Sequence, residues 1–277
     1  QARVALVKGD WQTAWDKATS IITSNKYKLV LRSAYTRMWK NDTGSEIIFQ
    51  PFMSDKEKGG SNGSVFQKKD ETDPYYIPNY GTLMMFVENE GDIRYDAWFT
   101  TYNDFLIEGE SYKAYVFCKY PGNVAINTTE NQFINKTKVF RTSEMYLIAA
   151  EAGAHLGGDK LSQANKYLND FCKKRYTGYQ DKTYSANELI KQTLAERKRE
   201  FLGEGMLWSD LRRTNQGFQR ISNFDIGDPE LDKINNVMFK VGKNLKYEAG
   251  DYRFTWPIPK GEIDSNPQMK GQQNPGY

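Results

Sequence analysis

The sequence predicts a mostly α-helical protein that carries a loop-rich insert with short strands. Apolar residues recur at helical spacing at the start of the chain and over residues 136–221, whereas the part between alternates like short strands. With 277 residues, 39% of them hydrophobic and 26% charged, the chain can bury a large core. We expect one domain over residues 1–277, divided into a helical hairpin (1–39), the insert (40–135), helical hairpins (136–221) and an extended tail (222–277).

The first 39 residues have the pattern of two amphipathic helices joined by a tight turn. The second helix has an apolar face spaced at three, four and seven residues, made of Trp11, Ala14, Trp15, Ala18, Ile21 and Ile22. Ala2, Ala5 and Leu6 form a similar stripe before it, and Gly9-Asp10 separates the two. Such a pair is the unit of a helical-hairpin repeat.

Residues 40–135 have a different pattern. EIIFQPF (46–52) and YKAYVFCKY (112–120) alternate and are rich in β-branched or aromatic residues, which predicts short strands. Residues 59–63 are rich in glycine and predict a loop. We expect one short helix before a loop within residues 80–99.

The hairpin pattern returns after the insert. Residues 142–156 and 161–175 each place apolar and alanine residues on one face, and a third pair is expected at 186–203 and around 207–221. Alanine where two helices approach is typical of tetratricopeptide-like hairpins. Residues 222–250 have weak periodicity and are expected to wrap the surface. The tail FTWPIPKGEIDSNPQMKGQQNPGY is rich in Pro and Gly, so we expect it to be extended and held by side-chain contacts.

Composition excludes or disfavours several functional classes. A net charge of +3 over 38 basic and 35 acidic residues disfavours a dedicated nucleic-acid-binding protein. Cys118 and Cys172 lack metal-ligand spacing; we interpret them as two buried thiols, with one disulfide as the alternative. His155 is the only histidine, so a histidine-rich metal site is excluded, and we expect no cofactor and no metal. No apolar run is long enough for a membrane span.

The stretch LAERKREFLGEGMLWSDLRR (194–213) is the most highly charged part of the chain. Arg197 shares a helical stripe with apolar residues, so its guanidinium must be paired on the packed side. We therefore predict a structural ion-pair cluster made of Arg197, Glu200, Glu204, Asp210 and Arg212. The alternative is a glycosidase-like acid/base pair of Glu200 and Glu204. Neighbouring Arg and Lys would lower carboxylate pKa values, whereas a general acid needs a raised one, so we predict no catalytic residues.

Ligand contacts are expected from the aromatic residues of the insert. DPYYIPNY (73–80) and YDAWFTTYNDF (95–105) combine flat rings with amide and carboxylate groups, a combination that suits sugars. The predicted ligand-binding residues are Tyr75, Tyr76, Tyr80, Trp98, Tyr102 and Asn103. Phe86, Phe99 and Phe105 are expected in the core instead.

Several motifs resemble one known family. RTSEMYLIAAEA, a following helix ending in KKR, then ERKREFLGEGMLWSDLRRT, WPIPKGEIDSNP and a terminal QNPGY are together similar to the SusD/RagB family of Bacteroidetes nutrient-binding lipoproteins. VKGDWQTAWDKATSIITSNKY and EIIFQ resemble the same family further upstream. The resemblance implies a SusD-like fold and a non-enzymatic protein that captures oligosaccharide at the extracellular face of the outer membrane. It also implies a SusC-like TonB-dependent transporter as the partner.

The chain also departs from the family pattern. Where members usually show EGHRW, this chain has Glu204-Gly205-Met206-Leu207-Trp208. The chain starts within an apparent helix, and members are usually much longer, so we expect the N-terminal half and its lipid anchor to be missing here. Two alternatives to glycan capture remain: a peptide-binding member of the same family, and a helical-repeat interaction module without a small ligand.

Overall fold

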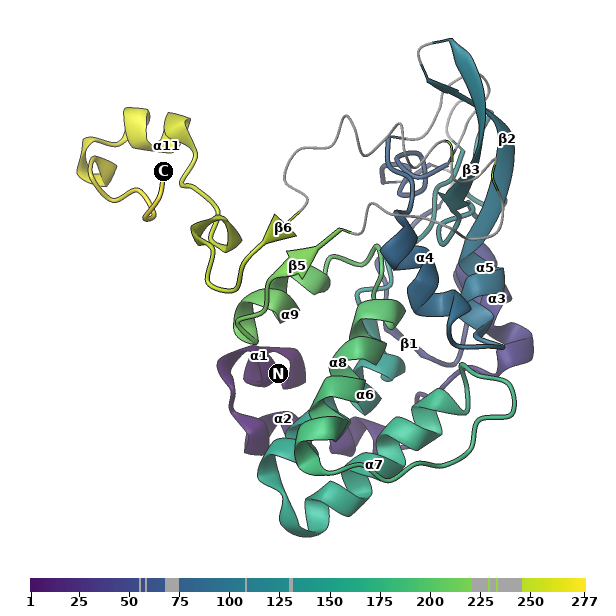
Figure 1. Cartoon of the computed structure of the whole chain (residues 1–277), viewed down its shortest axis with the longest axis vertical. Coiled ribbons are helices and arrows are strands. Elements are labelled where there is room, and N and C mark those ends of the chain that lie inside the picture. The colour runs from purple at the N-terminus through teal and green to yellow at the C-terminus, as the bar shows by residue number, and fades with distance from the viewer. Residues whose placement is uncertain are drawn as a thin grey trace.

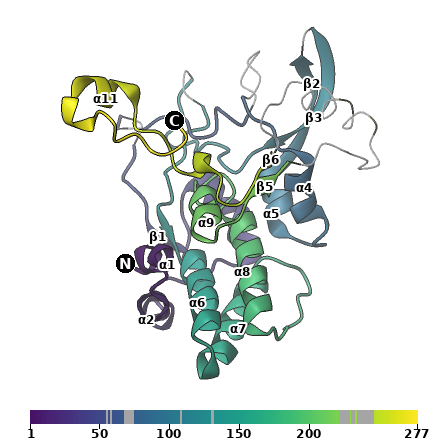
Figure 2. The same ribbon diagram turned by 60° about the vertical axis from the view of Figure 1, so that its left-hand side comes forward.

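The computed structural model describes residues 1–54, 56–57, 59–67, 75–107, 109–129, 132–220, 229, 233 and 246–277. A helical body lies at one end of the molecule, and a long β-hairpin projects at the other (Figure 1). The segment after β6 leaves the body near α9 as an arm, in both views (Figures 1 and 2). The mostly helical fold predicted from the sequence is confirmed.

The helical body is built around one buried helix. It contains α1 (Ala2–Lys8), α2 (Trp11–Thr23), α6 (Thr142–Leu156), α7 (Gly158–Cys172), α8 (Ala186–Glu200) and α9 (Leu207–Arg213). Helix α6 is buried over most of its length because α1 and α2 cover one side of it and α7 and α8 cover the other. Its alanines leave room for this close approach, as the sequence pattern predicts.

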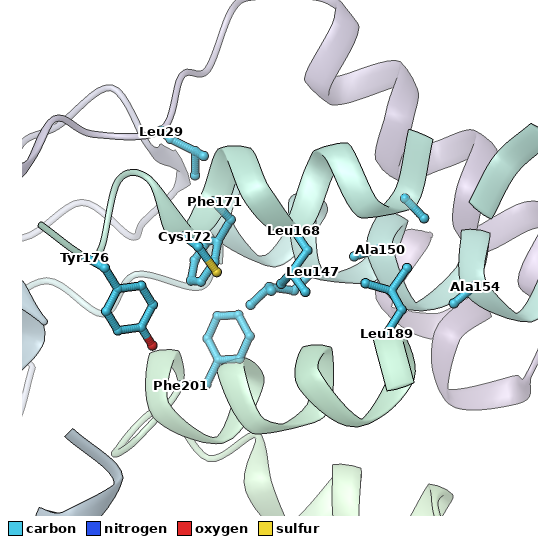
Figure 3. Packing of buried hydrophobic residues seen from close by; sticks show 11 residues of the cluster. Leu29, Leu147, Ala150, Ala154, Leu168, Phe171, Cys172, Tyr176, Leu189 and Phe201 are labelled. Atoms are coloured by element: carbon cyan, nitrogen blue, oxygen red, sulfur yellow. The ribbon is translucent and has the colours of Figure 1, made fainter. Parts of the chain in front are cut away.

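Two apolar clusters fix these helices. One joins α1, α2 and α6 and contains every residue of the predicted stripes in residues 1–22. The other joins α6, α7 and α8. Figure 3 shows Phe171 and Leu168 of α7 beside Leu147 of α6, with Phe201 and Leu189 on the α8 side. Burying a side chain of this kind contributes about 1.5–3 kcal/mol.

The turn between α1 and α2 forms where Gly9 was expected to break the helix. Gly9 has φ of 72°, a left-handed conformation that favours glycine, and its N–H donates to carbonyls of α1. Asp10 then caps α2, since its side chain accepts from the Thr13 N–H at 3.1 Å. The region 1–39 also contains most of a third helix, α3 (Arg32–Asn41), which the sequence pattern did not reveal.

A close helix contact at Gly153 leads to a first prediction. A Cβ there would lie 2.4 Å from the Trp15 ring on α2 and 2.7 Å from Ala164 on α7. We expect Gly153→Ala to lower the free energy of unfolding by about 1–3 kcal/mol through overpacking, although alanine is the better helix former. Gly261→Ala, in α11 where a Cβ meets open space, is the matched control. Equal stability of both variants in urea denaturation would contradict the prediction.

The insert holds more regular structure than predicted. It contains β1 (Ile47–Phe49), α4 (Tyr80–Val87), α5 (Ile93–Trp98), β2 (Phe99–Ile107) and β3 (Glu110–Phe117). Strand β1 pairs antiparallel with β4 (Phe140–Arg141), and β2 pairs antiparallel with β3. The predicted strands at 46–52 and 112–120 correspond to β1 and β3.

One expectation for the insert was wrong, and one strand was missed. Residues 80–99 form two helices rather than one, because Asp92 caps a second helix by accepting from the Arg94 N–H at 2.9 Å. Strand β2 was missed because a register shift between Tyr102 and Phe105 breaks its alternation. Phe86, Phe99 and Phe105 lie in the core as expected.

The arm combines short helices with side-chain contacts. Strand β5 (Phe218–Gln219) pairs with β6 (Lys246–Tyr247), and η1 (Tyr252–Phe254), α11 (Lys260–Ser265) and η2 (Pro267–Met269) follow. Gln273 exchanges two hydrogen bonds with the backbone of Ile258, and Asn274 donates to the Trp256 carbonyl at 2.6 Å. The expected side-chain contacts are therefore present, but the tail is not wholly extended. Most of residues 222–250, expected to wrap the surface, lie outside the described residues.

Among the described residues, the structure shows neither a membrane-spanning helix nor a disulfide bond. No helix among them is long and apolar enough to cross a membrane. Cys118 and Cys172 are both free, Cys172 buried and Cys118 half-buried.

Candidate ligand-binding site

Glu200 lies at the centre of a buried network of ion pairs. One of its carboxylate oxygens accepts from Arg141 Nη1 at 2.7 Å and from Arg175 Nη2 at 2.9 Å, and the other accepts from Arg175 Nε at 2.9 Å. Glu46 binds the same two arginines at 2.7–3.0 Å. All four side chains are almost wholly buried. The network joins β1, β4 and the ends of α7 and α8 into one unit.

Further ion pairs connect this network to two basic residues of the insert, Lys119 and Arg94. Glu204 accepts from Arg141 Nη2 and from Lys119 Nζ, each at 2.6 Å, and Lys119 also donates to the carbonyls of Glu200 and Leu202. Arg94 of α5 pairs with Asp92 at 2.8 Å and with Glu196 of α8 at 2.9 Å. Because Lys119 follows β3 and Arg94 lies on α5, these contacts attach the insert to the helical body.

Arg197 pairs with Asp210 rather than with a glutamate. Its Nε and Nη2 donate to the two oxygens of Asp210 at 2.9 and 3.1 Å. Arg212 does not take part in the ion pairs of the described residues: its side chain is exposed, because it lies on the outer side of α9. Arg213 takes the place predicted for Arg212 and pairs with Asp210 at 2.7 Å and with Glu151.

The surroundings of Glu200 are those of a structural carboxylate. Burial alone would raise its pKa, but Arg175 and Arg141 outweigh burial and hold the pKa of Glu200 well below its ordinary value. A general acid needs the opposite shift and contact with a substrate, whereas Glu200 is fully buried. The arrangement supports a structural role for Glu200 and gives no support to the acid/base alternative.

The predicted ligand-binding residues fall into three groups that differ in solvent exposure. Tyr75 and Tyr76 are exposed, at 76% and 65% of their surface, and Asn103 on β2 is exposed as well. Tyr80, at the start of α4, and Tyr102, on β2, are half-buried. The segment with Tyr75 and Tyr76 packs on the β2–β3 hairpin, because its Ile77 contacts a small cluster of Phe105, Ala114 and Tyr112.

Trp98 was wrongly predicted as a ligand residue. Its side chain is completely buried, with Trp39 and Phe86 packed edge-on at 5.9 Å and the Lys119 ammonium 4.0 Å from its ring centroid. The residue ends α5 on its inner side, so the ring joins the aromatic core of the insert. A ligand on the surface cannot stack on it.

A cavity of about 340 Å³ lies beside Phe66. Phe66 lines it and contacts the Tyr76 ring, with centroids 6.3 Å apart. Its polar lining comes from segments distant in the chain, namely Arg3, Asn62, Thr137, Lys138 and Glu204. Asn62 is fixed there, since its Nδ2 donates to the Asn135 carbonyl at 3.0 Å and to Thr137 Oγ1 at 3.2 Å.

Sequence reasoning missed Asn62 and Phe66. Asn62 lies in the glycine-rich stretch predicted as a loop, and its hydrogen-bond partners are more than 70 positions away. The candidate site is therefore the exposed Tyr75–Tyr76 pair together with the cavity beside Phe66. It offers flat rings next to fixed polar groups, which suits a ligand with both apolar faces and hydroxyl groups.

The chain resembles known proteins of one family. Residues 11–277 match the model described as the SusD family. Among solved structures, a SusD superfamily protein from Bacteroides thetaiotaomicron VPI-5482 is 28% identical with a TM-score of 0.76, over 99% of this chain and 58% of that one. A putative sugar binding protein from Bacteroides vulgatus ATCC 8482 is 26% identical with a TM-score of 0.76, over 100% and 57% of the two chains.

Surface glycan-binding protein A from Bacteroides uniformis shares the fold, with 21% identity and a TM-score of 0.67, over 99% of this chain and 59% of that one. The chain thus spans a little under three fifths of the length of these solved structures. No curated protein matches the chain.

Proposed function

Since this chain belongs to the SusD family, we propose that it binds glycan at the cell surface, without catalysis. Solved relatives support a sugar ligand, since they include a putative sugar binding protein and a surface glycan-binding protein. The observation that carries the proposal is the pair of exposed rings, Tyr75 and Tyr76, in a segment whose Ile77 packs on the β2–β3 hairpin.

Stacking and hydrogen bonding would act together at this site. Sugar C–H faces pack on aromatic rings, and a ring fixed by its backbone loses little conformational entropy on binding. The Tyr76 N–H donates to the Val65 carbonyl at 3.0 Å, which fixes the backbone beneath the ring. The exposed Asn103 has an amide group available for sugar hydroxyls, and Asn62, whose Nδ2 already donates to Asn135 and Thr137, would offer its Oδ1 as an acceptor.

The wider role follows from the family resemblance. We propose that the whole protein is lipid-anchored at the extracellular face of the outer membrane and passes oligosaccharide to a SusC-like TonB-dependent transporter. The helical hairpins at 1–39 and 136–221 would provide the docking surface, and the insert would provide the ligand contacts. Nucleic acid is not an expected partner.

Removing the two exposed rings should weaken glycan binding. We expect Tyr75→Ala/Tyr76→Ala to reduce affinity for a bound polysaccharide by about tenfold or more, because each lost stacking contact removes on the order of 1 kcal/mol. Isothermal titration calorimetry on a panel of polysaccharides measures this. Trp256→Ala is the control, since Trp256 is also highly exposed but lies on the arm. Binding of peptides and of no glycan would instead favour the peptide-binding alternative.

A further inference from the structure

A second cavity, of about 780 Å³, lies between the helical body and the insert. Its walls are one side of α8, the helix α9, the N-terminal end of α4 and strand β5. It has more than twice the volume of the cavity beside Phe66, and the residues that line the two are different. An oligosaccharide segment fits a space of this size.

Basic side chains outnumber acidic ones among the described residues that line this cavity. Lys191, Lys198 and Arg220 line it, and Asp210 is the carboxylate among its described lining residues. Asp210 is already neutralised, because it accepts from Arg197 at 2.9 Å and from Arg213 at 2.7 Å. Lys191 has only a long contact of 4.0 Å to Glu188, at the surface. The described residues that line the cavity therefore carry a surplus of positive charge.

The two lysines follow one stripe of α8. They are seven residues apart, which places them about 10 Å apart along the helix axis. Leu194 and Ala195 lie between them and line the same wall. Burial lowers the pKa of Lys198, and the neighbouring Arg199 lowers it further. A ligand with negative charge would favour the charged form of Lys198 and so oppose both effects.

The N-terminal end of α4 adds to this positive field. Asn79 caps the helix by accepting from the Thr82 N–H at 3.1 Å, and Asn79, Gly81 and Thr82 all line the cavity. The start of a helix carries a partial positive charge, which favours a nearby anion. This feature comes from the insert, whereas the lysines come from the helical body, so two independent parts of the fold favour negative charge.

Two aromatic rings line the same cavity. Trp208 is fixed because its Nε1 donates to the Phe254 carbonyl at 3.2 Å and its ring packs on Phe254 at 4.8 Å. Phe218 stacks on Tyr247 with centroids 5.0 Å apart. Both rings are half-buried, so each keeps an accessible part for a sugar face.

We propose that this cavity is a second glycan site, selective for oligosaccharides that carry carboxylate or sulfate groups. Lys191 and Lys198 contact the anionic groups, and Trp208 and Phe218 contact the sugar rings. The sugar component of this ligand rests on the proposed function, whereas the requirement for negative charge rests on the cavity alone.

The test compares charged and neutral forms of the same glycan. Calorimetry at low salt measures binding of oligogalacturonate and of its methyl ester, and of a sulfated galactan oligosaccharide and its desulfated form. We expect the charged form of at least one pair to bind at least tenfold more tightly. Lys191→Met/Lys198→Met should weaken that binding about tenfold, and high salt should have a similar effect. Lys8→Met/Lys17→Met, which removes the same charge from α1 and α2, should change little.

The outcomes separate the two proposals. Equal affinity for charged and neutral forms, no binding of either charged probe, or an equal effect of both lysine pairs would overturn the anionic site. Loss of neutral-glycan binding in Tyr75→Ala/Tyr76→Ala, with acidic binding retained, would support two sites. Acidic binding that depends on the lysines, with no effect of the tyrosines on any glycan, would uphold the inference and overturn the site proposed at Tyr75 and Tyr76.

Discussion

Replacing Glu200 with glutamine should lower the free energy of unfolding by about 3–5 kcal/mol. Glutamine keeps the shape of the side chain but removes the charge that Arg141 and Arg175 share at 2.7–2.9 Å. Glu46, with Glu204 on Arg141, would then have to neutralise the two buried guanidinium groups without it. An amide must also turn its NH₂ group toward one of these donors, so at least one hydrogen bond becomes a repulsive contact.

Urea denaturation of the folded chain measures this effect. Glu188→Gln is the control, since Glu188 lies on the same helix but is partly exposed, and its carboxylate contacts Lys191 at the surface and accepts from Gln192 Nε2 at 2.8 Å. That change should cost less than about 1 kcal/mol. If the two variants lose the same stability, the buried network does not contribute as the geometry implies.

The difference between wild type and Glu200→Gln should also depend on pH. The pKa of Glu200 is held well below its ordinary value in the folded protein, whereas it is about 4.3 in an unfolded chain. Stability from this carboxylate is therefore fully present above about pH 4.3 and is lost as pH falls toward the folded pKa. We expect the stability difference to be constant between about pH 6 and 8 and to shrink below about pH 4. Denaturation over a pH series would contradict this if the difference grew in acid.

The sequence predicted the helices of the body well, because each helix can be recognised from residues that are close together in the chain. Each apolar stripe of α1, α2, α6 and α7 lies within a single helix. These stripes meet in the two apolar clusters around α6. The position of Gly9 between two apolar stripes predicted the helix break. The structure explains the glycine there, because Gly9 has a left-handed conformation that favours this residue. The family resemblance then supplied the arrangement of these hairpins, which periodicity alone does not specify.

The partners of the charged stretch were not predictable from spacing. The pattern showed that Arg197 needed a partner, but Glu200 is bound by Arg141 and Arg175, which lie 59 and 25 positions away. Arg212 and Arg213 are adjacent, and the pattern could not decide which of them faces Asp210. A shift of one residue turns a helical side chain by about 100°, which is enough to exchange a buried position for an exposed one.

The same limit applies to the aromatic residues of the insert. Tyr75 and Tyr76 remain candidates because their side chains lie at the surface. Trp98 also lies in a stretch that mixes aromatic and polar residues, yet it lies at the junction of α5 and β2 and is completely buried. Exposure here depends on which face of an irregular segment packs inward, and a single sequence does not contain that information.

Asp42→Ala should be about as destabilising as Glu200→Gln, for different reasons. Asp42 ends α3 in a left-handed conformation with φ of 54°, which aspartate tolerates better than alanine. Its buried carboxylate accepts from Lys138 Nζ at 2.7 Å, from the Lys136 N–H and Asn123 Nδ2 at 3.0 Å, and from Asn135 Nδ2 at 3.2 Å. Removing it leaves the Lys138 ammonium buried without its carboxylate, at a cost of about 3–5 kcal/mol.

A double-mutant cycle separates the charge from the backbone conformation. Asp42→Asn keeps a residue that tolerates the left-handed conformation, so it should cost less than Asp42→Ala, and adding Lys138→Met should restore part of its stability because no charge is then unpaired. Lys138→Met alone leaves Asp42 buried with neutral donors and should also be destabilising. Strictly additive losses in urea denaturation would show that the pair is not coupled. Since Lys138 also lines the cavity beside Phe66, Asp42→Asn should weaken glycan binding there more than Trp256→Ala does, whereas acidic-glycan binding at Lys191 and Lys198 should be retained.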